Sequence, residues 1–170
     1  MSALPTKLNK GVLVFLLAGS VSSAYALKTD VEQPVNIEAD SAVFDKMAGK
    51  ASYEGNVRIQ QGTLQISAVR IDIDAPNNEI VSITASGAPV SLKQQMDNGK
   101  QVQGKARDIR YLVKEKRLIL HGDAELMQDK DRFTSNYIEY IPTTGQLIAG
   151  GKGKSGRVSA VFYPTNKAAE

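Results

Sequence analysis

Apolar and polar residues alternate with a period of two along most of the chain after residue 34. Such alternation is typical of β-strands with one buried and one exposed face. No segment after residue 26 shows a sustained apolar period of 3.6, which would indicate a helix. Residues that favour tight turns interrupt the alternation at regular intervals, at Gly49-Lys50, Gly62-Thr63, Pro76 to Asn78, Gly87 to Pro89, Asp97 to Gly99 and Thr143 to Gly145. The pattern predicts an all-β fold.

The alternating pattern occurs twice, 67 positions apart and without a gap. Residues 53–59 (YEGNVRI) match residues 120–126 (LHGDAEL), and residues 66–73 (ISAVRIDI) match residues 133–140 (FTSNYIEY). The order of apolar, polar and glycine positions repeats, although few residues are identical. A repeated strand–turn–strand unit cannot bury its apolar face alone and must stack on its neighbour. The repeat therefore predicts a stack with a continuous apolar interior and with strand edges at its two ends.

The apolar phase reverses within the second strand of each copy. In the first copy, even positions are apolar up to Ala68, and odd positions are apolar from Val69 to Ile73. The second copy reverses between Phe133 and Ile138. A reversal indicates a bulge or a corner, as occurs where a sheet folds over onto itself. Together with the short strands, it favours a sandwich, a jelly roll or a solenoid.

Residues 1–26 have the parts of a secretory signal peptide: Lys7 and Lys10, an apolar run over residues 11–19, and the cleavage motif Ala24-Tyr25-Ala26. The alternative is an uncleaved anchor, but the run falls short of the roughly 20 residues that a spanning helix needs. We expect residues 27–170 to form a single domain of an exported protein, with a frayed tail at about 165–170.

Composition narrows the possible functions. The chain has no cysteine, so a disulfide framework is excluded and stability must come from a core. The net charge of +3 (21 basic and 18 acidic residues) falls to +1 when Lys7 and Lys10 are removed, which leaves 19 basic residues. Binding to nucleic acid through general basicity therefore has little support.

No set of residues forms a convincing catalytic or metal site. Gly153-Lys154-Ser155 resembles the end of a phosphate-binding loop, but Ile148 stands where the first glycine is needed and no helix follows. His121 is the only histidine and lies in a predicted turn. Asp72 and Asp74 share one face, as paired acids of a hydrolase could, but we interpret them as the solvated side of an amphipathic strand. We expect no catalytic residues, no metal and no cofactor.

Four segments resemble the OstA-like family: residues 33–40 (QPVNIEAD), 53–57 (YEGNV), 61–64 (QGTL) and 96–100 (MDNGK). The resemblance covers nearly the whole chain after residue 26. It implies a twisted, V-shaped β-jelly-roll that stacks head to tail with copies of itself in the periplasm. It also implies docking to an inner-membrane anchor subunit and an outer-membrane assembly protein, and transport of lipopolysaccharide between the two membranes. A shorter hairpin at residues 76–78 and a shorter tail depart from the family, and the short tail puts in doubt how copies join.

An apolar groove between stacked strands would hold the acyl chains of such a lipid. Each buried CH₂ contributes about 0.8 kcal/mol, so a chain of a dozen carbons would cost on the order of 10 kcal/mol to expose. The alternative is that the inward-facing residues are ordinary core. The candidate floor residues are Val35, Ile37, Tyr53, Ile59, Leu64, Ile66, Leu92, Ile109 and Tyr111.

Residues 93–117 contain eight basic and three acidic side chains, a local net charge of +5. Lys105 and Arg107 share parity with Ile109 and Tyr111, which would place them at the mouth of the apolar face. There they could pair with lipid phosphates. The alternative is a solvated face.

The first and last predicted strands, residues 35–39 and 157–162, lie at opposite ends of the sequence. If both are edges, their unpaired backbone groups can pair with another chain, and a head-to-tail contact of this kind propagates into filaments. The alternative is that a loop or the tail covers each edge. The candidate assembly residues are Val35, Asn36, Ile37, Val158, Ala160 and Phe162.

Three functions remain open at this point. The first is a non-enzymatic bridge that carries lipopolysaccharide. The second is a structural module with a closed core, and the third is an enzyme acting on polysaccharide, which would need acids clustered in a groove. Binding of lipopolysaccharide and concentration-dependent rods would favour the first.

Overall fold

The structure is a computed structural model that describes residues 30, 33–96, 99–150 and 156–164. The predicted signal peptide and the predicted frayed tail lie outside these residues. No helix in the described ranges is long and apolar enough to cross a membrane. Apart from a short 3₁₀ turn at Pro76–Asn78, the secondary structure of the described residues is β: β1 (Asn36–Glu38), β2 (Ser41–Asp45), β3 (Lys50–Gln61), β4 (Leu64–Asp74), β5 (Ser82–Gln95), β6 (Gln101–Leu112), β7 (Arg117–Gln128), β8 (Asp131–Ile141), β9 (Gln146–Ala149) and β10 (Ser159–Val161). The all-β prediction is confirmed.

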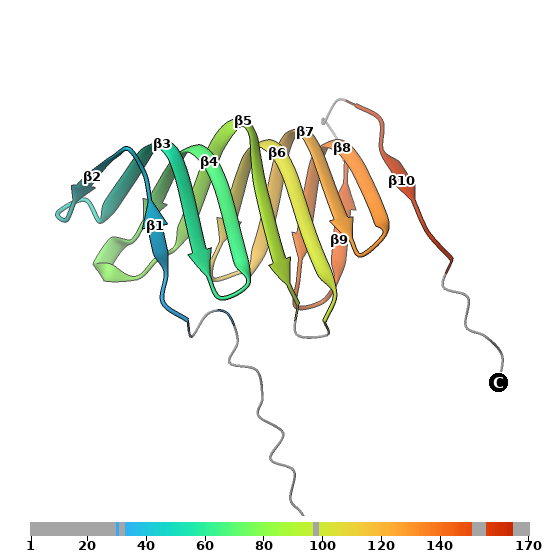
Figure 1. Ribbon diagram of the computed structural model, residues 1–170, viewed down its shortest axis with the longest axis horizontal. Coiled ribbons are helices and arrows are strands. Elements are labelled where there is room, and N and C mark those ends of the chain that lie inside the picture. Colours follow the sequence, from blue (N-terminus) through green and yellow to red (C-terminus); the bar gives the residue numbers. More distant parts are fainter. Residues whose placement is uncertain (1–29, 31–32, 97–98, 151–155, 165–170) are drawn as a thin grey trace, which may run out of the picture.

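All ten strands belong to one open antiparallel sheet. The long strands β3 to β8 follow one another in sequence order, each paired with the next. At one end, β1 and β2 both pair with β3; at the other end, β9 and β10 both pair with β8 (Figure 1). The open edges that the sequence predicts at both ends are therefore present.

Every long strand bends near its middle, where the pairing register shifts. Between β3 and β4 the shift falls between Glu54 and Val57, and each of the next four pairs has an equivalent shift. Bulges of this kind bend a strand and increase its twist. The bends divide the sheet into two arms that fold onto each other (Figure 1). Arm A contains residues 36–38, 57–68, 90–96, 99–106, 124–135 and 159–161, and arm B contains residues 41–54, 70–86, 108–121 and 137–149.

The predicted reversal of phase coincides with the bend. In β4, Ile66 points inward on arm A, and Ile71 and Ile73 point inward on arm B. Val69 departs from the prediction, because it lies at the bend with 58% of its surface exposed. Residues 87–89 also depart: they form the bend inside β5 and not a turn between two strands.

The 67-residue repeat is a repeat of structure. The strands β3 and β7 begin and end 67 positions apart, as do β4 and β8. Left-handed backbone angles recur at the same spacing, with Gly55 and Gly122 at φ 81° and 78°. A Cβ on Gly55 would lie 2.8 Å from the Cβ of Asp40. Glycine is thus required at this bend both for its φ angle and for the close approach of Asp40.

The apolar residues of both arms meet in one core. Fully burying a side chain of this size contributes about 1.5–3 kcal/mol, and the interior consists almost entirely of aliphatic side chains. The buried apolar residues are Val57, Ile59, Ile66, Ile71, Ile73, Ala85, Val90, Leu92, Val102, Ala106, Ile109, Leu118, Leu120, Ala124, Leu126, Ile138 and Tyr140.

Asp30 holds the segment before β1 against the β3–β4 hairpin. Its carboxylate accepts hydrogen bonds from the backbone N–H of Thr63 at 2.8 Å, from the Thr63 hydroxyl at 2.6 Å and from the amide of Gln94 at 3.0 Å. Partial burial disfavours the charged carboxylate and by itself would raise the pKa of Asp30. The hydrogen bonds from Thr63 and Gln94 outweigh burial and together hold this pKa below its ordinary value. The ionised carboxylate therefore fixes the chain as it enters the first edge strand.

Substituting Gly55 by alanine tests the bend. We expect Gly55→Ala to destabilise the fold by about 3 kcal/mol, because it adds a clash with Asp40 to the cost of a left-handed alanine. Gly145→Ala is the matched control: its φ is 68°, but the space around it is open, so it should cost only about 1 kcal/mol. Urea unfolding of both variants measures the difference. Equal losses in the two would contradict the required close approach.

Substituting Asp30 tests the anchor. In Asp30→Ala the backbone amide of Thr63 should lose its protection from hydrogen exchange, whereas the amide of Gln101, which bonds the carboxylate of Asp129 at 3.1 Å, should keep it. In the wild type the bond to Thr63 should persist at neutral pH and disappear as the pH falls through the lowered pKa of Asp30. An NMR titration of the Thr63 amide with a midpoint at or above the ordinary aspartate value would contradict the anchor.

Candidate functional site

The inner faces of the two arms carry rows of apolar side chains that run across the whole sheet. On arm B, the row nearer the bend follows the strand register from one end to the other. None of its members is charged, and most are aliphatic. In order, they are Ala42, Tyr53, Ile71, Ala85, Ile109, Leu120, Ile138 and Ala149. The apolar interior therefore extends to both ends of the described chain.

The nine predicted floor residues divide into three groups by burial. Four of them, Ile59, Ile66, Leu92 and Ile109, are buried in the core. Another four are partly buried and pack against it, namely Ile37, Tyr53, Leu64 and Tyr111. Val35 is half exposed just before β1. The structure thus places the first four within the packing of the arms, and it leaves part of the surface of the other five accessible.

Some of the partly buried apolar residues, among them Leu64, Ile83 and Tyr111, lie toward the side of the molecule opposite the bends, where the hairpins connect the strands. We call this side the hairpin rim. Leu64 begins β4 on arm A, and Ile83 and Tyr111 lie near the ends of their strands on arm B. Burial raises the pKa of the Tyr111 hydroxyl. Apolar surface is therefore available along the rim between the two arms.

The predicted position of Lys105 and Arg107 at the mouth of the apolar face is wrong. The bulge between Lys105 and Asp108 reverses the phase of β6, so Ala106 is inward and Lys105 lies on the outer face. Arg107 lies at the bend, 3.8 Å from the carboxylate of Asp123, and both side chains are largely exposed. Contact of these residues with phosphate, one of the two alternatives that the sequence leaves open, stays a prediction. Lys114 and Lys116 are the exposed lysines of this segment in the β6–β7 hairpin, at the rim.

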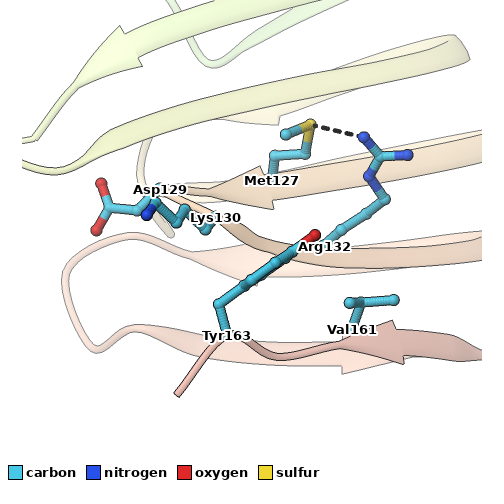
Figure 2. Close-up of a pocket in the computed structure, with 6 residues that line it drawn as sticks. All are labelled: Met127, Asp129, Lys130, Arg132, Val161 and Tyr163. Carbon is cyan, nitrogen blue, oxygen red and sulfur yellow. Dashed lines mark hydrogen bonds between the residues drawn. The ribbon is translucent and has the colours of Figure 1, made fainter. Parts of the chain in front are cut away.

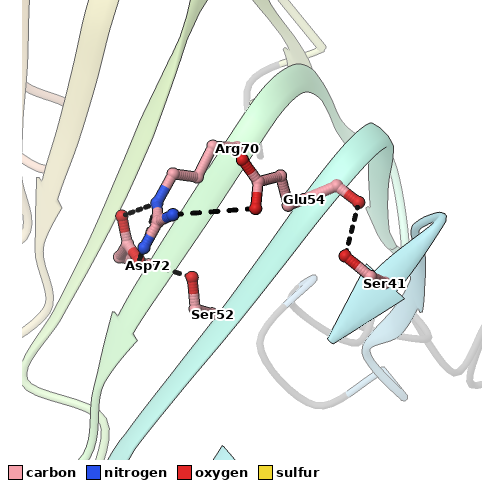
Figure 3. Close-up of polar contacts among 5 residues, drawn as sticks. All are labelled: Ser41, Ser52, Glu54, Arg70 and Asp72. Carbon is pink, nitrogen blue, oxygen red and sulfur yellow. Dashed lines mark hydrogen bonds and ion pairs between the residues drawn. The ribbon is translucent and has the colours of Figure 1, made fainter. Parts of the chain in front are cut away.

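The described residues of the outer face form polar networks. Arg70 donates hydrogen bonds to both carboxylate oxygens of Asp72 at 2.8–3.2 Å and lies 3.9 Å from Glu54, and the Ser52 hydroxyl donates to Asp72 at 2.8 Å (Figure 3). The bond from Arg70, opposed by partial burial and aided by Ser52, lowers the pKa of Asp72. Asp72 is thus an ionised structural partner of Arg70.

In the described part of the chain, neither His121 nor a group of metal-binding side chains forms a catalytic site. His121 is exposed and lies 3.9 Å from the carboxylate of Asp108. The described residues contain no group of three or more histidine, cysteine, aspartate or glutamate side chains that could hold a metal ion. The segment Gly153-Lys154-Ser155 lies outside the described residues.

Exposed apolar side chains concentrate at the two ends of the sheet. Of the twelve large apolar residues that are exposed in the described chain, only Val69, Ile80 and Val81 lie elsewhere. Phe44 packs edge-on against Tyr53 with ring centres 5.6 Å apart at one end, and Phe162 packs against Phe133 at 5.4 Å at the other. Those at the N-terminal end are Val35, Val43, Phe44 and Met47, and those at the C-terminal end are Ile148, Val158, Val161, Phe162 and Tyr163.

The candidate assembly residues lie on the outermost strands or beside them. Asn36 and Ile37 belong to β1, and Ala160 belongs to β10, which pairs only with β8. A shallow hollow lies beside β10, lined by Met127, Asp129, Lys130, Arg132, Val161 and Tyr163 (Figure 2). The hollow belongs to the C-terminal edge and does not reach the core.

Sequence reasoning missed the second edge strand at each end, β2 and β9. The repeat contained a signal for β2: residues 41–45 lie 67 positions before residues 108–112, so Ala42 and Phe44 match Ile109 and Tyr111. Each end of the molecule therefore presents two edge strands, one on each arm.

Comparisons with known proteins identify the family. Residues 36–146 match the family described as LptA/(LptD N-terminal domain) LPS transport protein. The chain is 37% identical over 160 residues to the lipopolysaccharide export system protein LptA of Haemophilus influenzae, covering 92% of both chains. It is 32% identical over 166 residues to LptA of Escherichia coli K12, covering 94% of this chain and 89% of that protein.

A solved structure shares the fold. The crystal structure of LptH, described as the LptA homologous periplasmic component of the conserved lipopolysaccharide transport device from Pseudomonas aeruginosa, matches with a TM-score of 0.72 and 26% identity. The match covers 79% of this chain and 99% of that chain. The similarity thus extends over nearly all of that solved chain. The chain belongs to the family of lipopolysaccharide transport proteins that contains LptA and the N-terminal domain of LptD.

Proposed function

We propose that this protein binds lipopolysaccharide by its acyl chains between the two arms and carries it through the periplasm without catalysing a reaction. The observation that supports this most directly is the apolar interior, which runs across the whole sheet and reaches both ends. The relatives named as lipopolysaccharide export proteins support the choice of ligand. The predicted signal peptide and the periplasmic relative support the compartment.

The energetics of acyl chains favour an interior of this shape. A chain of a dozen carbons gains on the order of 10 kcal/mol when it leaves water, so a carrier must keep it covered at every step. Because the apolar rows continue from strand to strand, a chain that moves along them exchanges one aliphatic contact for another. Movement along the interior therefore has little energetic cost. The driving force has to come from another component.

The open edges support a bridge. With two edge strands at each end, each paired on one side only, the protein has one site for a partner at either end. We propose that copies stack head to tail, that one end of the stack docks on an inner-membrane anchor subunit, and that the other end docks on an outer-membrane assembly protein. The exposed aromatic residues Phe44 and Phe162 would be covered in such contacts.

A purely structural module is the second candidate. The observation that favours it is the tight burial of Ile59, Ile66, Leu92 and Ile109, since a packed core needs no ligand. The two functions differ in one measurement, which is whether the purified protein retains lipopolysaccharide.

Tyr111 and Arg110 provide a matched test of binding, because they are neighbours on β6 that face opposite sides of arm B. We expect a photo-reactive amino acid at position 111 to crosslink to lipopolysaccharide and one at position 110 to leave it unlabelled. Tyr111→Asp should weaken binding by about tenfold or more, a free-energy loss of about 1.4 kcal/mol, because it places a charge at the apolar rim. Arg110→Asp should bind as the wild type does.

Circular dichroism of each variant separates loss of binding from loss of folding. Crosslinking from position 110 but not from position 111 would place the lipid outside the arms. Absence of lipopolysaccharide from every crosslinked and co-purified sample would leave the structural module as the function.

The basic segment gives a second test, of contact with phosphate. If headgroups extend beyond the hairpin rim, Lys114→Ala with Lys116→Ala should reduce the salt dependence of lipopolysaccharide binding, because fewer ion pairs are screened. Lys105→Ala with Arg107→Ala tests the position predicted from the sequence, and its distance from the rim leads us to expect a smaller effect. Binding measured between low and high salt checks both. A larger effect at Lys105 and Arg107 would show that headgroups reach the bend.

A further inference from the structure

The inner face of arm A becomes polar at the hairpin rim. Its middle row has no polar side chain from one end of the sheet to the other. In register order, this row is Ile37, Ile59, Ile66, Leu92, Gly104, Leu126, Phe133 and Ala160. The next row, two residues closer to the rim, alternates between amide and aliphatic side chains before it reaches an acid. Its members are Gln61, Leu64, Gln94, Val102, Gln128 and Asp131.

One of these amides is repeated in the two halves of the chain. When β3 and β4 are aligned with β7 and β8 at the spacing of 67 residues, three pairs are identical: Gly55 with Gly122, Ile71 with Ile138, and Gln61 with Gln128. The glycines serve the bend, and the isoleucines are fully buried in the core, so the fold explains both pairs. Packing does not explain the glutamines, because partial burial of an amide costs free energy unless the amide is hydrogen-bonded.

Hydrogen bonds within the chain show what these amides can bind. Gln61 donates to the backbone carbonyl of Gln33 at 3.0 Å, and Gln94 donates to the carboxylate of Asp30 at 3.0 Å. The segment before β1 therefore supplies an acceptor to each of them. Gln128 differs, because its amide makes no hydrogen bond to the residues that the structure describes. An inward amide of the second half of the sheet is thus available to a ligand.

Gln128 lies where the apolar interior ends. It is partly buried as the last residue of β7, and Leu126, two residues nearer the bend, is fully buried. Buried Val102 opposes Gln128 on β6, and Asp131 opposes it on β8. The carboxylate of Asp131 accepts a hydrogen bond from the backbone N–H of Tyr163 at 3.0 Å, which holds it at the C-terminal side of the row. A ligand at this point would have aliphatic contacts toward the bend and polar contacts at the rim.

We propose that Gln128 binds the linkage between an acyl chain and the sugar of lipopolysaccharide, and that it favours an amide linkage over an ester linkage. The proposal rests on the proposed binding of acyl chains between the arms, and it assigns the residue that selects the class of lipid. A carboxamide side chain both donates and accepts hydrogen bonds. The N-acyl group of an amino sugar also offers a donor and an acceptor, so the two amides can pair. An ester only accepts, and it leaves the oxygen of Gln128 without a partner.

Selection by the linkage gives the interior a property that apolar contacts alone lack. Glycerophospholipids carry similar acyl chains, but they attach them through esters. Burial of a chain depends on its apolar area and not on the group at its end, so an aliphatic groove holds both kinds of lipid. A site that hydrogen-bonds a particular N–H group discriminates against the analogue that lacks it. Gln128 would therefore distinguish the chains of an acylated amino sugar from those of a glycerophospholipid.

Two ligands that differ in the linkage test this role. One is glucosamine with a dodecanoyl chain on its nitrogen, and the other is glucose with the same chain on an oxygen. Each ligand competes with labelled lipopolysaccharide for the purified protein. We expect the wild type to prefer the N-acylated sugar by about fivefold, the effect of one additional hydrogen bond. Gln128→Met, which keeps the length of the side chain but can neither donate nor accept in this way, should remove most of the preference.

Gln103→Met is the matched control. Gln103 is also partly buried and lies on the neighbouring strand β6, but it belongs to the outer face of arm A, where it opposes Met127. This variant should keep the preference of the wild type. A photo-reactive amino acid at position 128 should crosslink to lipopolysaccharide, and one at position 103 should leave it unlabelled. Urea unfolding of Gln128→Met and Gln103→Met shows whether both are folded.

The outcomes separate this proposal from the proposed function. Loss of the preference in Gln128→Met alone, with crosslinking from position 128, would support the role of the amide. Equal competition by the two sugars against the wild type would overturn it without the need for any variant, as would a folded Gln128→Met protein that keeps the preference. In either case, lipopolysaccharide crosslinked from position 111 would leave the proposed function in place. Absence of lipopolysaccharide from the wild type and from position 111 would overturn both.

Discussion

The structure depends on one constraint, which is that an apolar sheet face must be kept from water. Most sheets meet it by packing against a helix or a second sheet. Here each long strand bends at its middle, and the two halves of the same strand cover each other. In β3 and β7 the bend uses left-handed backbone angles that glycine adopts readily, and Gly55 and Gly122 supply them at equivalent positions of the two units. The interior, the arms and the edges all follow from these bends.

A sheet whose strands cover their own inner faces still has an open strand edge at each end. Each strand protects its own inner face, but the side of each outermost strand is left without a neighbour, and the apolar rows stop there with Phe44 and Phe162 exposed. The same bends therefore create both the interior that suits acyl chains and the edges that suit another chain of the same kind. The ligand binding and the assembly that we propose would both be consequences of this one geometry.

Much of this architecture could be predicted from the sequence, because the repeat and the reversal of phase at Ala68 both follow from alternation. The position of Lys105 on the outer face could not be predicted. In β3 and β7 a glycine marks the bulge, but in β6 the bulge lies at Ala106 and Arg107, which carry no turn signal. If the alternation is extended across a bulge that the sequence does not mark, it assigns the residues on the far side of the bulge to the wrong face of the sheet.

Burial was also beyond prediction. Alternation shows which face a residue occupies, but it does not show how far the residue lies from the hairpin rim, and this distance separates buried Ile109 from partly buried Tyr111. In β5 the sequence suggested an interruption that the structure does not have. Gly87 and Pro89 resemble a turn, although the strand continues through them.

The number of strands in each arm fixes a unit of length. Each arm contains eight strand positions from one end of the sheet to the other, and neighbouring strands are about 4.8 Å apart. In the proposed stack, one copy would thus add on the order of 40 Å. A stack built from whole copies can change its length only in steps of this size.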